Sequence, residues 1–516
     1  MSSQHELILI LDFGSQYTQL IARRVREQGV YCEIHPFSTS LDRIKELNPK
    51  GVILSGGPSS VTDEDAPRLS KEFYANVNVP ILGICYGMQL IAVDLGGQSQ
   101  PAYEREYGHA QLKRQSGPTR LFSNLPEELD VWMSHGDHVT ELPEGFHKTA
   151  STGDVITAIE NPESNIYAVQ FHPEVAHTPK GKDILRNFLF YICSVEGDWT
   201  PAQFIEEEVE TIRETVGPDD RVVCGLSGGV DSTVAAMLVH KAIGDRQTCI
   251  FVNNGLLRYR EFEDTLRMYK NNLHLNVIGV DAADEFYAAL GKQSKPEKKR
   301  IAIGKTFIDI FDAEAKKIGG VKWLVQGTLY PDVIESVPIH GSSVTIKTHH
   351  NVGGLPEKMH LKLIEPLSEL FKDEVRIIGA DLDIPDEILQ RHPFPGPGLA
   401  VRILGSVTRP KVELLQKVDK IFIDELKENE LYGETWQAFA VLLPVKSVGV
   451  MGDFRTYETT IALRAVNSTD GMTADWTRLP LDFLAKVSSR ITSEIRGVNR
   501  VVYDITSKPP STIEWE

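Results

Sequence analysis

A cysteine stands between two glycines in the stretch Gly-Ile-Cys-Tyr-Gly of residues 83–87, a position that suits nucleophilic chemistry. An apolar run typical of a buried strand precedes it, and a helix-forming stretch follows it. This is the pattern of a nucleophile elbow, in which glycines permit a sharp turn and close backbone approach. The helix N-terminus favours the thiolate of Cys85, and the N–H of Tyr86 can stabilise an oxyanion. The alternative, a buried structural thiol, is what an isolated pattern of this kind indicates more often.

Two further stretches supply the groups that a cysteine nucleophile needs. Residues 55–58, Ser-Gly-Gly-Pro, end an apolar run and offer a flexible backbone N–H as a second oxyanion donor. Residues 166–174 read as a strand that ends in His-Pro-Glu. If the strand geometry continues, His172 and Glu174 point to one face, where the carboxylate orients the imidazole and the imidazole activates the thiol. His-Pro-Glu alone more often marks a surface turn, so the hypothesis depends on all three stretches occurring in this order.

A second candidate site lies in the glycine-rich stretch Ser-Gly-Gly-Val-Asp-Ser-Thr of residues 227–233, between an apolar run and a helix-forming stretch. Such a loop can cradle phosphate groups, because its backbone N–H groups converge and the helix dipole favours anions. It is not a Walker A loop, because no Gly-Lys-Ser/Thr sequence follows. Asp231 is a candidate Mg²⁺ ligand, since magnesium prefers one or two carboxylates together with phosphate oxygens. A tight turn capped by Ser or Asp is the alternative.

These candidate residues need strands and helices that present them at loop ends, and the hydrophobic pattern predicts such elements. Short apolar runs alternate with amphipathic stretches over the first two-thirds of the 516 residues, which predicts α/β domains with parallel sheets. Strands are expected at 7–11, 51–54, 80–84 and 167–171, and helices at 17–28 and 88–95.

The pattern changes twice along the chain. It breaks near 196–201, after which a helix is expected at 202–216 and a fresh strand at 221–226. Prolines and glycines at 392–398 exclude regular structure there, and the residues that follow read as α+β. We therefore predict two parallel-sheet α/β domains followed by a C-terminal α+β domain, with domains at 1–198, 199–395 and 396–516.

The composition restricts the classes of function. A formal net charge of −18 argues against general binding to nucleic acids or anionic membranes. The cysteines, at 32, 85, 193, 224 and 249, are odd in number and form no Cys-x-x-Cys pair, which argues against a disulfide framework and a structural zinc site. No apolar run approaches the roughly 18 residues of a membrane span, and the N-terminus lacks a signal-peptide pattern. We expect a soluble protein in the cytoplasm.

The stretches Gly-Gly-Pro, Gly-Ile-Cys-Tyr-Gly-Met-Gln and Gln-Phe-His-Pro-Glu together resemble the class I glutamine amidotransferase family, and the first predicted domain matches it in length and order. The resemblance implies a triad of Cys85, His172 and Glu174 that hydrolyses glutamine through a thioester and releases ammonia. It also implies an oxyanion hole from the amides of Gly57 and Tyr86. The positions that resemble glutamine-binding residues are Gln89, Ser134, His135 and Asp137. Papain-type proteases use related chemistry, but their Cys-Gly-(Ser/Ala)-Cys-(Trp/Tyr) sequence is absent.

The stretch Ser-Gly-Gly-Val-Asp-Ser resembles the PP-loop of the ATP pyrophosphatase family. The resemblance implies cleavage of ATP between the α and β phosphates and formation of an adenylate, which ammonia from the first domain can attack. Lys372 matches a family position near ATP, and a solvated helix-surface lysine is its equally weighted alternative. The implied ATP- and pyrophosphate-binding residues are Ser227, Gly228, Gly229, Val230, Asp231, Ser232, Thr233 and Lys372.

Four longer stretches, at 327–336, 347–355, 391–399 and 508–516, are similar to the glutamine-hydrolysing GMP synthase family, and the similarity runs from end to end of the chain. It implies amination of xanthosine monophosphate (XMP) at C2 through an adenyl-XMP intermediate, with Mg²⁺, ATP and glutamine. The implied products are GMP, AMP, pyrophosphate and glutamate. A homodimer formed through the C-terminal domain is also implied. The implied XMP-binding residues are Arg300, Gln437, Lys508, Ile513 and Glu514.

Several alternatives stay open. Another glutamine-dependent PP-loop amidating ligase would use a different acceptor, and a catalytically silent regulator would bind the nucleotides without turnover. The basic run 292–300 is either a solvated loop or a mobile lid over phosphates. Ammonia transfer along a sheltered path and transfer by domain rotation are equally open. A polar active-site or interface role is preferred over a metal site for four histidines that lack zinc-finger spacing, His340, His349, His350 and His360.

Overall fold

The computed structural model describes residues 5–336, 361–451, 454–468 and 473–516, and the chain divides into two compact units. The first unit contains the residues up to Phe204 and a short segment that begins at Ile334, and the second contains the rest of the chain from Ile205, inside helix α6 (Pro201–Thr215). The domain boundaries expected at 198/199 and 395/396 remain predictions. No helix of the described ranges is long and apolar enough to cross a membrane.

The first unit is built on one mixed sheet with the strand order β2-β1-β3-β4-β9-β8-β7-β5-β6. Its parallel half comprises β2 (Tyr31–Pro36), β1 (Leu7–Asp12), β3 (Gly51–Leu54), β4 (Ile81–Ile84) and β9 (Ile166–Val169). Its antiparallel half comprises β8 (Val155–Asn161), β7 (His147–Thr152), β5 (Gln98–Arg114) and β6 (Glu128–Glu141). The expected parallel strands are found, although β9 ends at Val169 rather than at 171, and the antiparallel half of the sheet is an addition that the sequence did not predict.

The helical segments that lie wholly within the described part of the first unit are α1 (Thr18–Arg26), α2 (Leu41–Leu47), α3 (Phe73–Asn76), α4 (Tyr86–Asp94), α5 (Gly181–Arg186) and the π-helical η1 (Asn187–Ile192). Every residue of β1, β3, β4 and β9 is buried, as in parallel strands covered on both faces. The carboxyl ends of β3, β4 and β9 meet at one edge of the sheet, so the residues that follow these strands converge there.

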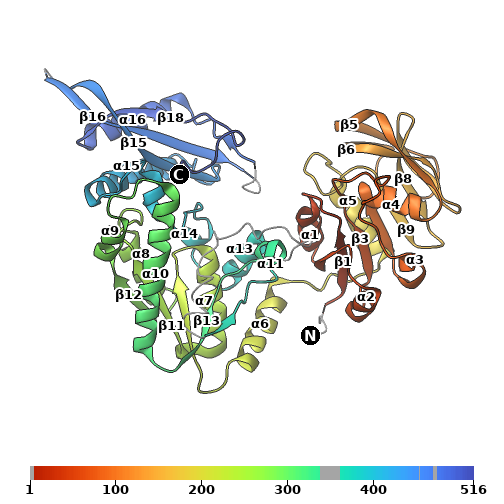
Figure 1. Ribbon diagram of the computed structural model, residues 1–516, viewed down its shortest axis with the longest axis horizontal. Coiled ribbons are helices and arrows are strands. Elements are labelled where there is room, and N and C mark those ends of the chain that lie inside the picture. The colour runs from red at the N-terminus through yellow and green to blue at the C-terminus, as the bar shows by residue number, and fades with distance from the viewer. Residues whose placement is uncertain (1–4, 337–360, 452–453, 469–472) are drawn as a thin grey trace. The chain divides into compact units, whose positions relative to one another are not determined.

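The second unit contains an all-parallel sheet with the order β12-β11-β10-β13-β14, as predicted for an α/β region. The strands are β10 (Arg221–Leu226), β11 (Gln247–Asn253), β12 (Val277–Asp281), β13 (Val321–Val325) and β14 (Lys362–Ile364). Figure 1 shows α10, the long green helix, beside this sheet. The other helices of this region are α7 (Val230–Ile243), η2 (Gly244–Arg246), α8 (Glu261–Asn271), α9 (Ala283–Leu290), α10 (Pro296–Ile318), α11 (Tyr330–Ser336), α13 (Lys372–Asp381) and α14 (Asp386–Leu389).

The C-terminal part of this unit is α+β, as predicted. Its sheet pairs β15 (Gln437–Met451) antiparallel with β16 (Phe454–Asn467), which also pairs with β17 (Asp475–Trp476) and with β18 (Val498–Tyr503). Helices η3 (Gly398–Arg402), α15 (Arg409–Glu428) and α16 (Leu481–Glu494) complete it, and Figure 1 draws these elements in blue. One buried cluster joins residues of β10, η3, α15 and β15, so the two sheets of this unit share a core.

Residues 292–295 of the basic run are irregular and exposed, as a solvated loop predicts, but α10 begins at Pro296 within the run. Lys299 is fully buried and donates to the carbonyl oxygens of Ala400, at 3.1 Å, and Ile403, at 2.7 Å. It also pairs with the carboxylate of Glu516. A buried ammonium needs such partners, so this lysine fixes structure rather than facing solvent.

Candidate active sites

Cys85 occupies the turn between β4 and α4, and its backbone is strained. Its φ of 54° and ψ of −106° lie where residues with a side chain rarely occur, so surrounding contacts must hold it there. The flanking glycines permit this packing. A Cβ on Gly87 would lie 2.5 Å from the carbonyl oxygen of Leu54, and one on Gly83 would lie 2.7 Å from that of Gly87. Cys85 therefore has the strained strand-to-helix geometry of a nucleophile elbow.

His172 and Glu174 follow β9 in an irregular turn, and their side chains form a buried hydrogen bond. Nδ1 of His172 lies 2.7 Å from Oε1 of Glu174. The expected reason for this pairing was wrong, because β9 ends at Val169 and strand alternation does not reach His172. Backbone contacts place the turn instead. The N–H of His172 donates to the carbonyl oxygen of Trp132 at 3.1 Å, and Thr178 Oγ1 donates to that of His172 at 2.7 Å.

The charges around His172 favour its protonated form. Burial opposes that charge, but the Glu174 carboxylate and Cys85 raise the pKa of His172 well above its usual range. Gly56 lies against both reactive groups. A Cβ there would be 3.3 Å from Cε1 of His172 and 3.7 Å from Cβ of Cys85. Because Nδ1 is engaged by the carboxylate, Nε2 is the nitrogen left for the thiol, and the arrangement can hold a thiolate–imidazolium pair.

The residues implied to bind glutamine surround this thiol. The Cys85 thiol donates to the carbonyl oxygen of Ser134 at 3.6 Å. The carbonyl oxygen of Asp137 accepts from Nε2 of Gln89 and from Nδ1 of His135, both at 2.9 Å. Burial lowers the pKa of His135 to about 4, so its imidazole is neutral at neutral pH. The four implied glutamine-binding residues therefore form one connected group beside Cys85.

Gly57 and Tyr86, the implied oxyanion donors, lie side by side. A Cβ on Gly57 would lie 3.4 Å from Cγ of Tyr86 and 2.9 Å from the carbonyl oxygen of Phe13. The loop after β3 is therefore packed closely on the first turn of α4. Two backbone amides contributed by these neighbouring segments suit the two donors that an oxyanion requires.

Gln170 was not singled out from the sequence, although it opens the stretch Gln-Phe-His-Pro-Glu. Its side-chain amide donates to Sγ of Cys85 at 3.7 Å, and its Oε1 accepts from Nε2 of Gln89 at 3.4 Å. It thus links the thiol to the group implied to bind glutamine. Its position directly after β9, two residues before His172, was the available signal.

The loop 227–233 joins β10 to α7 and is stabilised from within. The Oγ of Ser232 accepts from the N–H of Ser227 at 3.2 Å, and Oγ1 of Thr233 donates to the carbonyl oxygen of Gly229 at 2.8 Å. Gly228 has a φ of +78°, which glycine adopts without strain. Val230 and Thr233 are buried, so their side chains serve packing, while those of Ser227, Asp231 and Ser232 are at least partly accessible.

Asp231 and Lys372 meet at the start of α7, although the Lys372 side chain is exposed, so both interpretations of Lys372 remain predictions. The Lys372 ammonium, at the first residue of α13, pairs with Oδ2 of Asp231. The other oxygen, Oδ1, is buried without a hydrogen-bond partner among the described residues. A carboxylate oxygen of this kind fits the hard ligand that Mg²⁺ prefers. No group of three or more His, Cys, Asp or Glu in the described ranges can hold a metal by itself.

The residues implied to bind XMP gather mainly around the C-terminal tail. Gln437 Nε2 donates to Oε1 of Glu514 at 2.7 Å, and Arg300 Nη2 donates to the carbonyl oxygen of Glu516 at 2.7 Å. Arg402, which the sequence did not single out, is fully buried and donates to both oxygens of Glu514, at 2.8 and 3.1 Å. Glu514 is thus fixed from two sides.

Ile513 and Lys508 occupy two different surroundings in this tail. Ile513 packs against the small apolar cluster of Phe439, Val441 and Ala462. Lys508 pairs through its backbone with Ala474, with N···O distances of 2.7 and 3.0 Å, at a surface cavity of about 600 Å³. The described contacts therefore bring Gln437, Ile513 and Glu514 together around β15, and they place Lys508 at the edge near β17. His340, His349, His350, His360 and the stretch 347–355 lie outside the described residues.

Comparisons with known proteins agree with this division of sites. Three family models match: glutamine amidotransferase class-I over residues 9–192, NAD synthase over residues 202–306, and GMP synthase C terminal domain over residues 424–515. The chain is 58% identical over 512 residues to the GMP synthase (glutamine-hydrolyzing) of Cytophaga hutchinsonii, covering 99% of this chain and 100% of that relative. It is 58% identical over 510 residues to the protein of that name from Carboxydothermus hydrogenoformans, covering 99% of each. The corresponding Aquifex aeolicus protein is 58% identical over 514 residues, covering 99% of this chain and 100% of that relative.

Proposed function

The chain belongs to the glutamine-hydrolysing GMP synthase family, and from this premise we propose how its residues divide the reaction between two sites. It is a ligase that makes GMP with glutamine as the amide donor and that uses ATP. The alternative acceptors and the silent regulator are not favoured.

The first site hydrolyses glutamine. The Cys85 thiolate attacks the side-chain amide carbon, and the His172 imidazolium gives its proton to the departing ammonia. The amides of Gly57 and Tyr86 stabilise the oxyanion. Water, activated by the now neutral His172, then cleaves the thioester and releases glutamate. Support comes from the strained backbone of Cys85 and from the buried hydrogen bond between His172 and Glu174.

The second site activates XMP. The O2 atom of XMP attacks the α-phosphorus of ATP, the α–β bond breaks, and pyrophosphate leaves on the loop 227–233. Ammonia then attacks C2 of the adenyl-XMP intermediate, AMP departs with O2, and loss of a proton gives GMP. Support comes from the Gly228 conformation and the helix N-terminus behind it. Gln437, Ile513 and Glu514 hold the purine nucleotide, with Arg300 and Lys508 as candidate phosphate partners.

Asp231 is the residue that would hold Mg²⁺. When bound, this ion neutralises charge on the phosphate oxygens of ATP. The Lys372 ammonium pairs with Oδ2 of this carboxylate, which leaves Oδ1 for the ion. A single protein carboxylate suffices here, because Mg²⁺ usually completes its coordination with substrate phosphates and water.

The observation that carries this proposal is the strained Cys85 beside a buried His–Glu pair, on the same chain as a phosphate-binding loop without a Walker lysine. The test is product analysis with XMP, ATP, Mg²⁺ and glutamine. GMP and AMP in equal amounts support it. GMP with ADP would overturn the role of the loop, and no GMP from either glutamine or ammonium would overturn the acceptor.

The C-terminal domain is proposed to form a homodimer. The β15–β16 hairpin exposes Val448, Val450, Phe454 and Tyr457 by 60, 72, 78 and 65%. Val448 pairs with Tyr457 across the hairpin and Val450 lies two residues further along β15, so these three side chains share one face. An exposed apolar group of this kind usually meets a partner. Sedimentation of the variant Val448→Asp/Val450→Asp should show monomers. Leu481→Asp, a control at an apolar residue 83% exposed on α16, should leave the dimer intact. A monomeric wild-type protein would contradict the proposal.

A cytoplasmic location is also proposed. All five cysteines are free and buried, which fits a reducing compartment. Fractionation of cells that produce the protein should place it with cytoplasmic markers. Recovery with an exported or membrane fraction would contradict this location.

A further inference from the structure

Residues 391–394, here called the strap, follow α14 and contact both parts of the proposed synthetase site. Arg391 contacts the loop 227–233, and the next residues contact β15 and the residues around Glu514. Neither Arg391 nor His392 has a role in the proposed mechanism so far. Both are nevertheless engaged in several polar contacts that join segments far apart in the sequence.

At its first end, the strap fixes the phosphate-binding loop. Nη1 of Arg391 donates to the carbonyl oxygen of Gly228 at 2.7 Å, and Nη2 pairs with the carboxylate of Glu261. The guanidinium lies so close that a Cβ on Gly228 would be 2.9 Å from Nη1. A loop that directs N–H groups at phosphates needs other donors for its carbonyl groups. Arg391 is such a donor, and Thr233 is the donor for Gly229.

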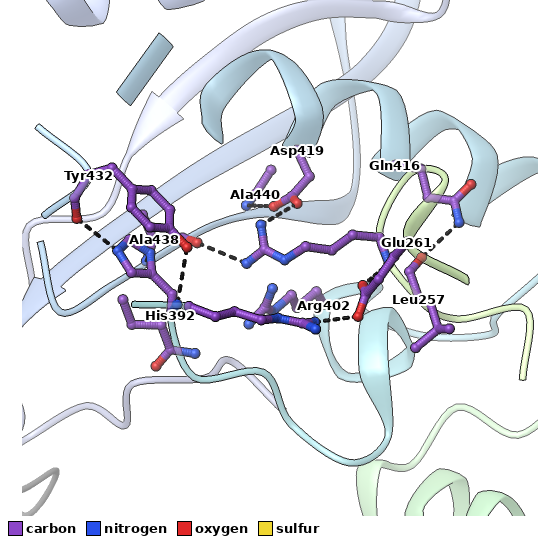
Figure 2. A network of polar contacts seen from close by, with 12 residues as sticks. Leu257, Glu261, His392, Arg402, Gln416, Asp419, Tyr432, Ala438 and Ala440 are labelled. Atoms are coloured by element: carbon purple, nitrogen blue, oxygen red, sulfur yellow. Dashed lines mark hydrogen bonds and ion pairs between the residues drawn. The ribbon is translucent and has the colours of Figure 1, made fainter. Parts of the chain in front are cut away.

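At its second end, the strap is anchored to the C-terminal sheet. Figure 2 shows His392 between Tyr432 and Ala438. Nδ1 of His392 accepts from the N–H of Ala438 at 3.2 Å, so Nε2 carries the proton and donates to the carbonyl oxygen of Tyr432 at 2.9 Å. The imidazole ring of His392 and the phenol ring of Tyr432 stack with their centroids 3.7 Å apart. This ring is buried, and both of its nitrogens are used for anchoring.

The strap also reaches the residues implied to bind XMP. The carbonyl oxygen of Pro393 accepts from Nε2 of Gln437 at 3.1 Å, and the same amide donates to Glu514. Three guanidinium groups surround the ring of Phe394, those of Arg258, Arg391 and Arg402, at 5.4, 5.5 and 5.0 Å from its centroid. Because the third of them binds Glu514, a shift of the strap would disturb the loop and the tail together.

We propose that Arg391 is a positioning residue, which acts through Gly228 and the strap to fix the α-phosphate of ATP relative to the purine of XMP. This inference rests on the proposed function, since it requires ATP on the loop and XMP near Glu514. In-line attack depends on placement of the two reacting atoms, and a misplacement of about 1 Å can cost about a hundredfold in rate. Arg391 therefore contributes to the rate of adenylation more than to the binding of either nucleotide.

The experiment measures GMP and AMP formation with ammonium as the nitrogen source, so that glutamine hydrolysis does not enter. Arg391→Gln should lower kcat by roughly ten- to a hundredfold while the KM for XMP changes by no more than about threefold. Arg391→Lys restores one donor and should give an intermediate kcat. Arg267→Gln is the matched control, because Arg267 is an exposed arginine on α8, the helix that also carries Glu261. It should behave as wild type.

A variant at the other end of the strap distinguishes two explanations of a lower kcat in Arg391→Gln. One is loss of the link between the loop 227–233 and the C-terminal sheet, and the other is a local distortion of the loop alone. His392→Ala removes the anchor to Ala438 and Tyr432 without touching Gly228, and it should also lower kcat. Urea unfolding of each variant identifies any that fails to fold. If Arg391→Gln or His392→Ala does not fold, the kcat of Arg391→Lys decides whether the inference holds.

Two outcomes would overturn the inference while leaving the proposed function intact. One is a wild-type kcat together with a raised KM for ATP in Arg391→Gln, which would make Arg391 an ATP-binding residue only. The other is wild-type kcat for both His392→Ala and Arg391→Gln. Wild-type enzyme that forms no GMP and AMP would instead contradict the proposed function itself.

Discussion

Nδ1 of His172 and Oε1 of Glu174 lie 2.7 Å apart in a buried hydrogen bond, and this pairing controls the charge of the imidazole. The Glu174 carboxylate and Cys85 raise the pKa of His172 although burial opposes that change. The imidazolium of the thiolate–imidazolium pair therefore persists to higher pH than that of an isolated histidine, because the pKa of an isolated histidine is about 6.5. Activity that depends on the pair must decline as pH rises through the raised pKa.

Glu174→Gln should lower the pKa of His172 and move the alkaline limb of the glutaminase pH profile to lower pH. It should also reduce kcat by roughly a hundredfold or more, because the imidazole loses its orientation and its charge partner. Glu33→Gln is the control, since Glu33 also pairs with a histidine two residues away, His35, at 2.8 Å in the same unit. An unmoved alkaline limb in Glu174→Gln would contradict the assignment.

The strained backbone of Cys85 makes a prediction about stability. Cys85→Gly should resist urea better than Cys85→Ala by about 1 kcal/mol, because glycine relieves a positive φ that alanine retains. Cys193 provides the matched comparison, since it is a buried cysteine with a φ of −78°. There the order should reverse, with Cys193→Ala more stable than Cys193→Gly. Greater stability of Cys85→Ala than of Cys85→Gly would contradict the strain.

His392 should make the second unit sensitive to acid. Burial lowers the pKa of His392 to about 4, from an ordinary value of about 6.5, so only the unfolded chain takes up a proton between these values. Its contribution to stability is complete above about pH 6.5 and declines as pH falls toward about 4. At pH 5 the loss is about 2 kcal/mol.

The variant His392→Asn keeps an acceptor near the position of Nδ1 but cannot titrate. Urea unfolding at pH 7 and pH 5 should therefore show a smaller loss of stability in His392→Asn than in wild type. His274→Asn, at an exposed histidine between α8 and β12, should keep the wild-type difference. Equal acid sensitivity in wild type and His392→Asn would show that the buried ring does not carry this effect.

Asp231 should set the requirement for Mg²⁺. Removal of the ion with a chelator should stop AMP formation, and Asp231→Asn should raise the Mg²⁺ concentration for half-maximal activity at least about tenfold, since even outer-shell changes cost that much. Asp264→Asn, at an exposed carboxylate of α8, is the control. A Mg²⁺ dependence that is identical in Asp231→Asn and wild type would exclude this carboxylate as a ligand.

Local patterns in the sequence predicted the elements that carry both sites. The strand 221–226 and the loop after it were found where expected, because an apolar run, glycines and a helix start are all local signals. The pair His172 and Glu174 was also predicted, but from strand alternation rather than from the turn that places it. The polar strand β5 was missed, because its sequence lacks a buried apolar run.

Contacts between distant residues could not be predicted from the sequence. Arg391 meets Gly228 across 163 positions, and Arg402 meets Glu514 across 112. No spacing rule links such residues. In the sequence alone, a fully buried arginine that is paired with a carboxylate cannot be distinguished from an exposed arginine. The prediction that the basic run 292–300 is exposed to solvent failed at Lys299 for the same reason, because distant residues bury this one member of the run.

The central claim is that one chain carries two separable activities, and Cys85→Ala tests it most directly. GMP formation from XMP and ATP should be lost with glutamine, because the nucleophile is gone, and should remain at the wild-type rate with ammonium. Urea unfolding should confirm that the variant is folded. Loss of GMP formation with both nitrogen sources in a folded variant would contradict the two-site account, and so would glutamine use that survives the substitution.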